Sequence, residues 1–502
     1  MYRISFFLAL LSFLLTFQLC IGLAGIKMLA SDESGPSAEQ TIGKTRALLS
    51  WKDYTQLFQK SYSSWTQQLA RQRLFISKTI AVFVAAAKYQ LGRSSFYLAI
   101  NRFSDLTPEE EKRLSGEILD DSEEENEGLM DDQEVGKIIS EALLEEEKKQ
   151  QAMSRRRRRK RSPELGTGSE GQPESGTGAL RSIQLSDLVR PPSSPAEREK
   201  TLALLTDDER PSGQLEGGGT KDYFDQNELG VDWRSSGCVA PPMDQGICSS
   251  CYAVSSISFV EWAFCMAQDR KITPLSAQYI VSCGHQFGEE TNPTKYQLKG
   301  CTNGRTWQVM DFIQDYGVEL ETFFPYYGED LFCPVERNTP RKLKGYLRPN
   351  VSKTVRMYST TSNLDLALKL SPVLISFRMP KNFLSFAGGI MDSCGTRPED
   401  RLGGHSMLVV GSGVSKEDGS AYLLIKNSMG TDWGEGGYLR LKRDAVKECV
   451  KEFIWPRLTF PSRKAIARRG KAHEARLFSV DEEEGEHEHE ENDELGLEAI
   501  LH

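Results

Sequence analysis

Hydrophobic side chains recur at helical spacing between residues 48 and 90. The intervals are near three, four and seven residues, which is the period of one face of an α-helix. The positions are Trp51, Tyr54, Phe58, Leu69, Phe75, Val82 and Ala86. The pattern ends at Leu91 and Gly92, and apolar side chains then alternate over residues 96–100. We therefore predict an amphipathic helical segment followed by a short extended one.

The first 30 residues have a targeting pattern. One basic residue, Arg3, precedes an uncharged apolar run over residues 4–26, and small residues such as Ala24 and Gly25 stand at its end. This is typical of a secretory signal peptide. The run is also close to the roughly 20 residues that span a bilayer, so an uncleaved signal anchor is the alternative interpretation. The small residues favour cleavage. Both alternatives place the rest of the chain in the secretory pathway, where cysteines form disulfides.

Two long stretches have a composition that does not favour folding. Residues 109–149 are strongly acidic, and Gly, Ser and Pro dominate residues 162–219. Such segments bury too little apolar surface to offset chain entropy. We predict a disordered linker over residues 113–225 and a disordered tail over residues 461–502. A metal site at His487 and His489 in the tail is the less favoured alternative.

A polybasic run lies inside the predicted linker. Residues 155–161 are all Arg or Lys. A solvated patch and a nuclear signal are the usual interpretations of such a run. In a secreted chain we favour cleavage by a convertase after Arg161, because a flexible polybasic strand fits an acidic protease cleft.

Charge is segregated along the 502 residues. The formal net charge is -9, but residues 231–460 carry 26 basic and 24 acidic side chains, so the flanks hold the whole acidic excess. The clustered basic charge of a nucleic-acid-binding surface is absent from this middle region. A hydrophobic fraction of 39% and a charged fraction of 26% exclude a wholly membrane-embedded protein.

The middle region also holds nine of the ten cysteines. An odd number in an oxidising compartment leaves one thiol over, and such a thiol is a candidate nucleophile. Only His285 and His405 lie in the same region. His285 follows Gly284 in a loop-like stretch and is predicted to be exposed. His405 is therefore the favoured partner of the free thiol.

Three segments carry the candidate chemistry. They read DQGICSSCYA over residues 244–253, GHSMLVVG over residues 404–411 and IKNSMGTDWGEGGY over residues 425–438. Taken singly, Cys251 would fit a disulfide, His405 a core histidine and Asn427 a turn. Together and in this order, the segments resemble the papain family of cysteine proteases.

The resemblance assigns a role to four side chains. Cys251 would attack the peptide carbonyl as a thiolate, and His405 would protonate the leaving amine and later activate water. The helix N-terminus and the imidazole would favour a thiolate–imidazolium pair before substrate arrives. Asn427 would orient the imidazole, and Gln245 would donate to the tetrahedral oxygen together with the Cys251 N–H.

The resemblance also implies the disulfides. It pairs Cys248 with Cys301, Cys283 with Cys333, and Cys394 with Cys449. Cys238 and Cys265 then remain, and we pair them with each other so that Cys251 stays free.

The N-terminal helical pattern resembles the family's inhibitory propeptide. The positions that match its ERFNIN spacing are Gln67, Arg71, Phe75, Lys78, Val82 and Ala86, with Gln in place of Glu and both asparagines replaced. Residues 101–105, which read NRFSD, fit the motif that follows. The resemblance implies a zymogen whose own propeptide runs through the cleft. Protonation of carboxylates at low pH would then weaken the propeptide contact.

The chain departs from the family pattern at several cleft positions. Ser249 replaces Gly, Tyr252 and Met429 replace Trp, and a methionine at 429 would shield the Asn427–His405 hydrogen bond less. Tyr252 resembles dipeptidyl peptidase I at that position. The resemblance assigns substrate binding to Ser249, Gly304, Arg305, Thr306, Gly404 and Trp433. With Gly403 and Ser406 also at the main specificity pocket, a more polar pocket is implied.

We predict an α+β, papain-like, two-lobed fold, with a helical half from about Val231, a β-barrel-like half from about Pro372, and the cleft between them. The predicted parts are a signal peptide or anchor (1–30), a helical inhibitor domain (47–112), the linker (113–225), the catalytic domain (226–460) and the tail (461–502).

The predicted function is endopeptidase cleavage of protein or peptide substrates by a monomer, without cofactor or metal, in a lysosome-like, vacuolar or extracellular compartment. A silent papain-fold binding protein and an exopeptidase are the alternatives. Asn350 begins a glycosylation sequon.

Overall fold

The computed structural model describes residues 49–119, 128–160, 228–268, 270–291, 296–334, 347, 349–360 and 362–460. The predicted signal segment, Arg161, most of the linker and the tail lie outside these ranges, and those predictions stay open. The chain divides into two compact units: residues 1–107 with 385–387, and the remainder. No helix within the described residues is long and apolar enough to cross a membrane.

The first unit is built on helix α4 (Trp65–Gln90), which is preceded by α3 (Trp51–Leu57) and followed by β1 (Phe96–Leu98). The predicted helical pattern is thus two helices, each capped by a serine side chain. The apolar positions of the pattern form the core, which consists of Tyr54, Phe75, Val82, Leu98 and Ile100.

The two propeptide motifs of the first unit contact each other. Arg71 on α4 donates from Nη1 to the backbone oxygen of Asp105 at 3.0 Å. The Asp105 carboxylate accepts from the hydroxyls of Tyr54 at 2.6 Å and Tyr62 at 2.9 Å, and pairs with Lys60 at 2.8 Å. The motif at residues 101–105 is therefore tied to the helical motif by buried polar contacts.

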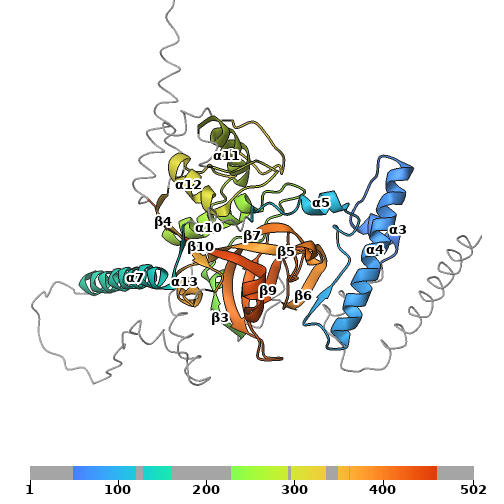
Figure 1. Cartoon of the computed structure of the whole chain (residues 1–502). Coiled ribbons are helices and arrows are strands. Elements are labelled where there is room, and N and C mark those ends of the chain that lie inside the picture. Colours follow the sequence, from blue (N-terminus) through green and yellow to red (C-terminus); the bar gives the residue numbers. More distant parts are fainter. Residues whose placement is uncertain are drawn as a thin grey trace, which may run out of the picture. The chain divides into compact units, whose positions relative to one another are not determined.

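The second unit combines a curved sheet with a group of helices. The strands are β2 (Leu129–Met130), β3 (Leu229–Asp232), β4 (Asn350–Tyr358), β5 (Val373–Pro380), β6 (Phe386–Met391), β7 (Arg401–Val414), β8 (Ala421–Lys426), β9 (Tyr438–Lys442) and β10 (Val450–Thr459). The sheet order is β6-β9-β8-β7-β5-β10-β4-β2, with β3 paired to β7. Figure 1 shows β5 to β10, in orange and red, curving together as one sheet.

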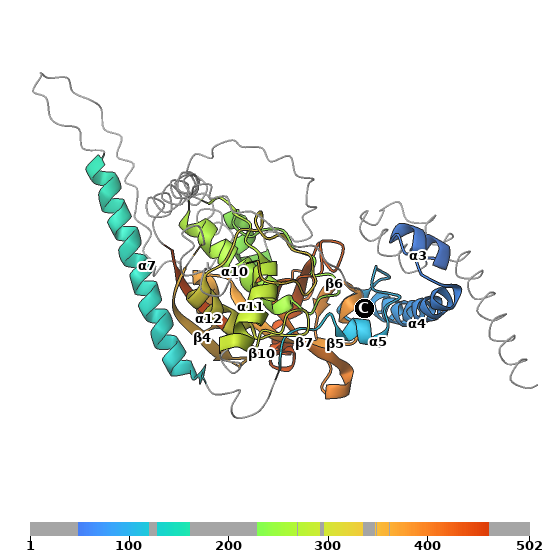
Figure 2. The same cartoon turned by 90° about the horizontal axis from the view of Figure 1, so that it is seen from above.

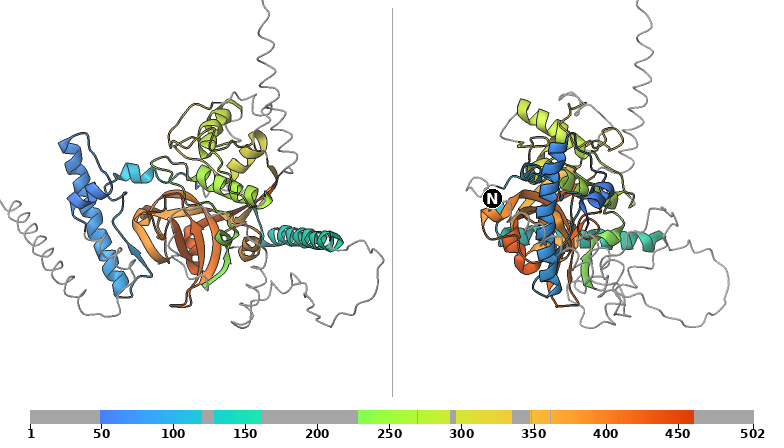
Figure 3. Two further views of the ribbon diagram at one scale, coloured as in Figure 1. Left: turned by 180° about the vertical axis from the view of Figure 1, so that it is seen from behind. Right: turned by 90° about the vertical axis from the view of Figure 1, so that its right-hand side faces the viewer.

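The helices of the second unit are α5 (Pro108–Lys112), α7 (Asp132–Lys160), α10 (Cys251–Ala267), α11 (Ala277–Thr291), α12 (Thr306–Tyr316), α13 (Leu364–Leu370) and α14 (Val446–Cys449). Both views of Figure 3 place the green-to-yellow helices α10, α11 and α12 on one side of the sheet. Helix α10 is apolar almost all round and nearly every residue in its first three turns is buried, as expected of a central core helix.

The α+β fold and its two halves agree with the prediction, but the boundary between them does not. Strand β3 pairs with β7, and β4 pairs with β10. Both strands precede Pro372 and yet belong to the β-rich half. Their partners lie about 100 or more residues later in the chain. A local pattern of side chains does not reveal such distant pairing.

The prediction of a structureless linker over residues 113–225 is wrong for residues 113–119 and 129–160. Strand β2 adds to the sheet edge beside β4 in parallel, and α7 follows it. Figure 2 shows α7, in teal, as one long helix close to β4. Val135, Ile138, Ile139 and Ala142 are buried at helical spacing. Charged residues surround these few apolar positions, so composition hid an amphipathic stripe.

All four predicted disulfides are present. They join Cys238 to Cys265, Cys248 to Cys301, Cys283 to Cys333 and Cys394 to Cys449. Cys251 is the free cysteine of the described residues, and it is buried.

Candidate active site

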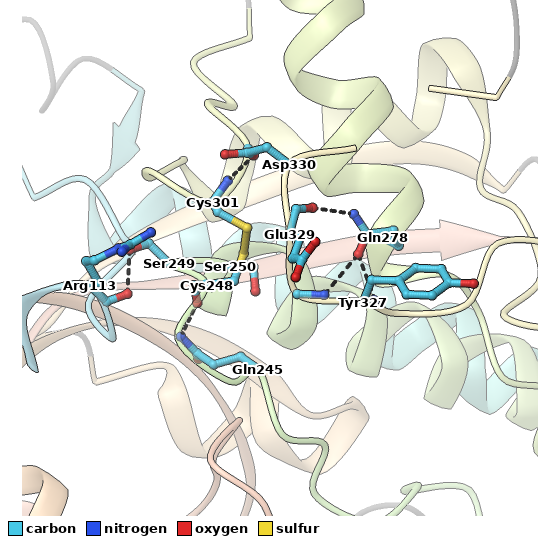
Figure 4. The surroundings of a disulfide bond; sticks show 12 residues. Arg113, Gln245, Cys248, Ser249, Ser250, Gln278, Cys301, Tyr327, Glu329 and Asp330 are labelled. Carbon is cyan, nitrogen blue, oxygen red and sulfur yellow. Dashed lines mark hydrogen bonds between the residues drawn. A yellow bond between two sulfur atoms is a disulfide. The ribbon is translucent and has the colours of Figure 1, made fainter. Parts of the chain in front are cut away.

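The loop before α10 places Cys251 at the first position of that helix. Tyr326 holds this loop, because its hydroxyl donates to the Gln245 backbone oxygen at 2.9 Å and lies 2.5 Å from the Ser250 hydroxyl. The Cys248–Cys301 disulfide fixes the same loop to a neighbouring one (Figure 4). The thiol is therefore carried by a covalently braced turn at a helix N-terminus.

His405 and Asn427 come from neighbouring antiparallel strands. His405 lies in β7 and Asn427 directly follows β8. The imidazole Nε2 is 2.7 Å from Asn427 Oδ1, and the Ser428 N–H donates to the same oxygen at 2.8 Å. The ring of Phe383 packs against the imidazole at 5.6 Å. Both polar side chains are buried, so the imidazole plane is held by the contacts that the resemblance implied.

Gln245 is fixed at both ends of its amide. Its Nε2 donates to the Cys248 oxygen at 2.8 Å and to the Leu114 oxygen at 3.2 Å. Its Oε1 accepts from the Ser428 hydroxyl at 2.6 Å. Sequence reasoning missed Ser428, and the only signal for it was its position directly after Asn427.

Residues 113–119 lie in the cleft and bond to both of its walls. The Ser249 hydroxyl donates to the Arg113 oxygen at 2.5 Å, as Figure 4 shows. On one wall, the Gly304 N–H donates to the Gly116 oxygen at 2.8 Å. On the other wall, the Glu117 N–H donates to the Gly404 oxygen at 3.1 Å. We call residues 113–119 the cleft strand.

Gly116 of the cleft strand passes close to the loop before α10. A Cβ atom at this position would lie 2.0 Å from the backbone oxygen of Ser249. No real Cβ contact is that short, so any larger residue requires a backbone shift. Gly304 is constrained in a similar way, because a Cβ there would lie 2.6 Å from the Tyr252 ring.

Burial by the cleft strand keeps the thiol protonated. Loss of solvent raises the pKa of Cys251 to about 12, and the nearby Glu117 carboxylate adds to the rise. The N–H groups of Ser406, Gly116 and Tyr252 oppose it. Burial likewise lowers the pKa of His405 to about 4, against the effects of Asn427 and the Leu114 oxygen. Both shifts favour the neutral thiol and the neutral imidazole, so the expected thiolate–imidazolium pair is disfavoured while residues 113–119 occupy the cleft.

Protonation of the Glu117 carboxyl has the opposite effect on the propeptide contact to the one expected for activation by acid. Burial raises the pKa of its carboxyl from 4.5 to about 8, although hydrogen bonds from Thr306 and Ser376 oppose the rise. A group whose pKa is raised on folding stabilises the folded form fully below its unfolded value. That contribution is lost between about pH 4.5 and 8. Acidification therefore strengthens this contact, and the expectation that protonation weakens it is wrong for Glu117.

The other predicted site residues differ in what they contact. Thr306 begins α12 and binds the Glu117 side chain. The Arg305 Nε donates to Gln297 at 2.7 Å. Trp433 packs against Phe383 at 4.8 Å and donates its indole N–H to the backbone oxygen of the same residue. Trp433 is thereby joined to the His405 side of the cleft.

His285 does not lie in an exposed loop as predicted. It lies within α11 and is half-buried. The preceding Gly284 packs closely on Leu298, whose side chain would be 3.0 Å from a Cβ there. Gly284 is thus a helical glycine that lets α11 pack closely on Leu298, and not a loop glycine.

Two family models match this chain. The papain family cysteine protease model matches residues 228–453, and the cathepsin propeptide inhibitor domain model matches residues 51–110. The first match contains Cys251, His405, Asn427 and Gln245, and the second contains α3 and α4.

Individual relatives agree with these matches. A cathepsin L-like proteinase of Phaedon cochleariae is 24% identical over 404 residues, which is 80% of this chain and 90% of that protein. The oryzain gamma chain of Oryza sativa subsp. japonica is 32% identical over 214 residues, 42% of this chain and 54% of that protein. The chain thus spans about half the length of the plant relative.

A solved structure shares the fold. Digestive procathepsin L 3 of Tenebrio molitor larval midgut has a TM-score of 0.51 and 20% sequence identity, over 84% of this chain and 99% of that one.

The cleft strand can be tested by adding one methyl group. Gly116→Ala cannot be accommodated beside Ser249, so we expect water to reach Cys251. Alkylation of Cys251 by iodoacetamide at pH 7, followed by peptide mapping of the intact chain, should become at least about tenfold faster, since one pKa unit changes the thiolate fraction by about that factor.

Gly136→Ala is the matched control. Its Cβ would meet Asn363 only at 3.5 Å, an ordinary contact, so its alkylation rate should equal that of the unmodified chain. Equal rates in both variants would show that the strand does not protect the thiol.

Proposed function

We propose that this chain, which belongs to the papain family of cysteine proteases and carries an inhibitory propeptide, is an endopeptidase that acts through Cys251, His405, Asn427 and Gln245. The observation that carries the proposal is the joint placement of the free thiol at a helix N-terminus and of an imidazole held by an amide oxygen. The proposed substrates are proteins or peptides.

The proposed reaction begins when the cleft strand leaves. Water then reaches the cleft and removes the main cause of the raised thiol pKa. The Tyr252 N–H and the N-terminus of α10 favour the thiolate, and His405 accepts the thiol proton. The charged pair therefore forms only in the open enzyme.

The thiolate would attack the carbonyl carbon of the scissile peptide bond. The carbonyl oxygen becomes an oxyanion, which Gln245 Nε2 and the Cys251 N–H would stabilise. In the closed form Nε2 already donates to a backbone carbonyl of the cleft strand, that of Leu114. This contact supports the assignment, because a carbonyl oxygen occupies the position where a substrate oxygen would bind.

Collapse of the tetrahedral intermediate would break the C–N bond. His405 gives its proton to the leaving amine, and a thioester to Cys251 remains. His405 then takes a proton from water, the hydroxide attacks the thioester, and the acid product and the thiol are released. Asn427 acts by positioning, because its oxygen holds the imidazole through Nε2.

We also propose how this chain matures and where it is located. A signal-like N-terminus and four disulfides support the secretory pathway and a lysosome-like, vacuolar or extracellular destination. Convertase cleavage after Arg161 remains a proposal that the intact mass of the secreted protein tests. Asn350 is exposed at the start of β4, as an acceptor of glycans would need to be.

Replacement of the nucleophile is the direct test of this function. Cys251→Ala, processed in trans, should lose all thiol-dependent hydrolysis of a peptide library, since no other free thiol exists within the described residues. Residual thiol-dependent cleavage in the variant would contradict the assignment of Cys251.

An epoxide probe separates this enzyme from a binding protein without turnover. The processed, unmodified chain should be labelled at Cys251 and lose activity in proportion to labelling. A binding protein without turnover is considered because Ser249 and Met429 depart from the family pattern. Labelling with no hydrolysis of any peptide would support the binding protein. Release of dipeptides alone would support the exopeptidase.

Ser428 is predicted to position the oxyanion donor. Ser428→Ala removes the hydroxyl that fixes Gln245 Oε1 and leaves the backbone in place. We expect kcat to fall by roughly tenfold with little change in KM, because removal of an oxyanion donor itself costs about 100- to 1000-fold. Ser235→Ala, at an exposed position shortly after β3, is the control. A change in KM alone would show that Ser428 does not act through the transition state.

A further inference from the structure

The Glu117 side chain is buried in a pocket of the cleft, with 6% of its surface exposed. The Thr306 N–H donates to both carboxyl oxygens, at 3.2 and 3.3 Å. The Thr306 hydroxyl donates to Oε2 at 2.6 Å, and the Ser376 hydroxyl donates to Oε1 at 3.0 Å. Every one of these contacts comes from the second unit, so the pocket is complete within it.

The pocket wall is polar beyond these first contacts. Ser406 Oγ lies 2.7 Å from the Thr306 hydroxyl and 2.6 Å from the Ser255 hydroxyl. Buried hydroxyl and N–H donors need partners, and a site built around them disfavours a side chain that cannot supply an acceptor. An aliphatic side chain in the place of Glu117 would leave the donors of Thr306 and Ser376 without that partner.

A buried ion pair lies next to the pocket that holds Glu117. Glu452 pairs with Arg356 at 2.8 Å, and both side chains are buried. The Arg356 guanidinium also lies over the Trp307 ring at 4.9 Å. Arg356 is thus the paired cation of Glu452, although the Glu452 charge still contributes to the raised pKa of Glu117. Ser376 Oγ lies 3.5 Å from Glu452 and separates this pair from Glu117.

The backbone around Glu117 shows how another strand would reach the same pocket. Gly304 bonds to both neighbours of Glu117, since its N–H donates to the Gly116 oxygen and its oxygen accepts from the Ile118 N–H at 2.9 Å. A residue that pairs with Gly304 in this way directs its side chain to Thr306. A substrate strand that uses the Gly304 backbone would do the same once residues 113–119 have left.

We propose that this pocket selects substrates with a glutamate or glutamine side chain, which ends in a carboxyl or carboxamide group. The Glu117 side chain of the chain itself occupies the pocket in the way that we propose for the substrate side chain. The inference rests on the proposed peptidase function. Glutamate and glutamine share the length and the planar head group, and differ in the proton that the head group carries.

The pH dependence distinguishes the two side chains. The ionisable and charged groups around the Glu117 carboxyl are Glu452, Arg356, Cys251 and Tyr252. Burial favours the protonated carboxyl there, with the pKa of Glu117 raised to about 8. A substrate glutamate would therefore bind as the neutral acid, and the ratio of kcat/KM for glutamate over glutamine should rise as the pH falls from 7 to 5. Ionisation of Cys251 and His405 changes kcat/KM by the same factor for both substrates, so it does not affect the ratio.

The test is a fluorogenic peptide library that varies each of the two residues on either side of the scissile bond, measured with the processed enzyme. At one position, glutamate or glutamine should exceed leucine and arginine by at least about tenfold in kcat/KM. Thr306→Val, which removes only the hydroxyl, should reduce that preference by about tenfold or more. The matched change Thr322→Val, at an exposed turn, should leave it unaltered.

The outcomes separate this inference from the proposed function. Hydrolysis with a preference for leucine or arginine at every position would overturn the pocket assignment and leave the peptidase function intact. A preference that Thr306→Val does not change would also overturn it. No thiol-dependent hydrolysis of any peptide would instead overturn the proposed function. A glutamate to glutamine ratio that is constant between pH 7 and 5 would exclude recognition of the neutral acid.

Discussion

Exclusion of water from one thiol is the constraint on which the closed form of this protein depends. The backbone of residues 113–119 covers Cys251, and the contact is close enough that only glycine fits at position 116. Desolvation then makes the charged forms of both Cys251 and His405 unfavourable. The His405 imidazole already lies 2.7 Å from Asn427 in this form. For the proposed enzyme, inhibition would thus be electrostatic as well as steric.

The same strand contacts several of the residues proposed to bind substrate. Its Leu114 carbonyl accepts from Gln245, its Gly116 carbonyl accepts from Gly304, and its Glu117 side chain fills the polar pocket. The strand thereby supplies an acceptor to Gln245 Nε2, to the Gly304 N–H and to the Thr306 hydroxyl. These contacts therefore indicate which acceptor groups a substrate would have to provide once the cleft is empty. This is the physical link between the inhibited state, the proposed reaction and the proposed preference for a carboxyl or carboxamide side chain.

Much of this arrangement could be predicted from the sequence, because its motifs are short and local. The residues around Cys251, His405 and Asn427 indicated the family, and the apolar positions of α4, such as Phe75 and Val82, indicated the propeptide core. The remainder depends on contacts between distant residues. Composition hid α7, since the buried apolar side chains that the structure describes on it, Val135, Ile138, Ile139 and Ala142, lie on a highly charged helix. Neither the bond from Ser428 to Gln245 nor the pocket for Glu117 has a local signature, because each joins residues more than 180 positions apart.

The ionisation of His405 tests the central claim most directly. Its imidazole can be followed by NMR as a function of pH in the intact chain and in the chain from which the propeptide has been removed, with the signal assigned by its loss in His405→Gln. We predict a titration midpoint near 4 in the intact chain and a midpoint higher by at least about two pH units after removal, when the thiolate partner forms. The same titration midpoint of His405 in both forms would contradict the claim that the cleft strand keeps Cys251 and His405 neutral by excluding water.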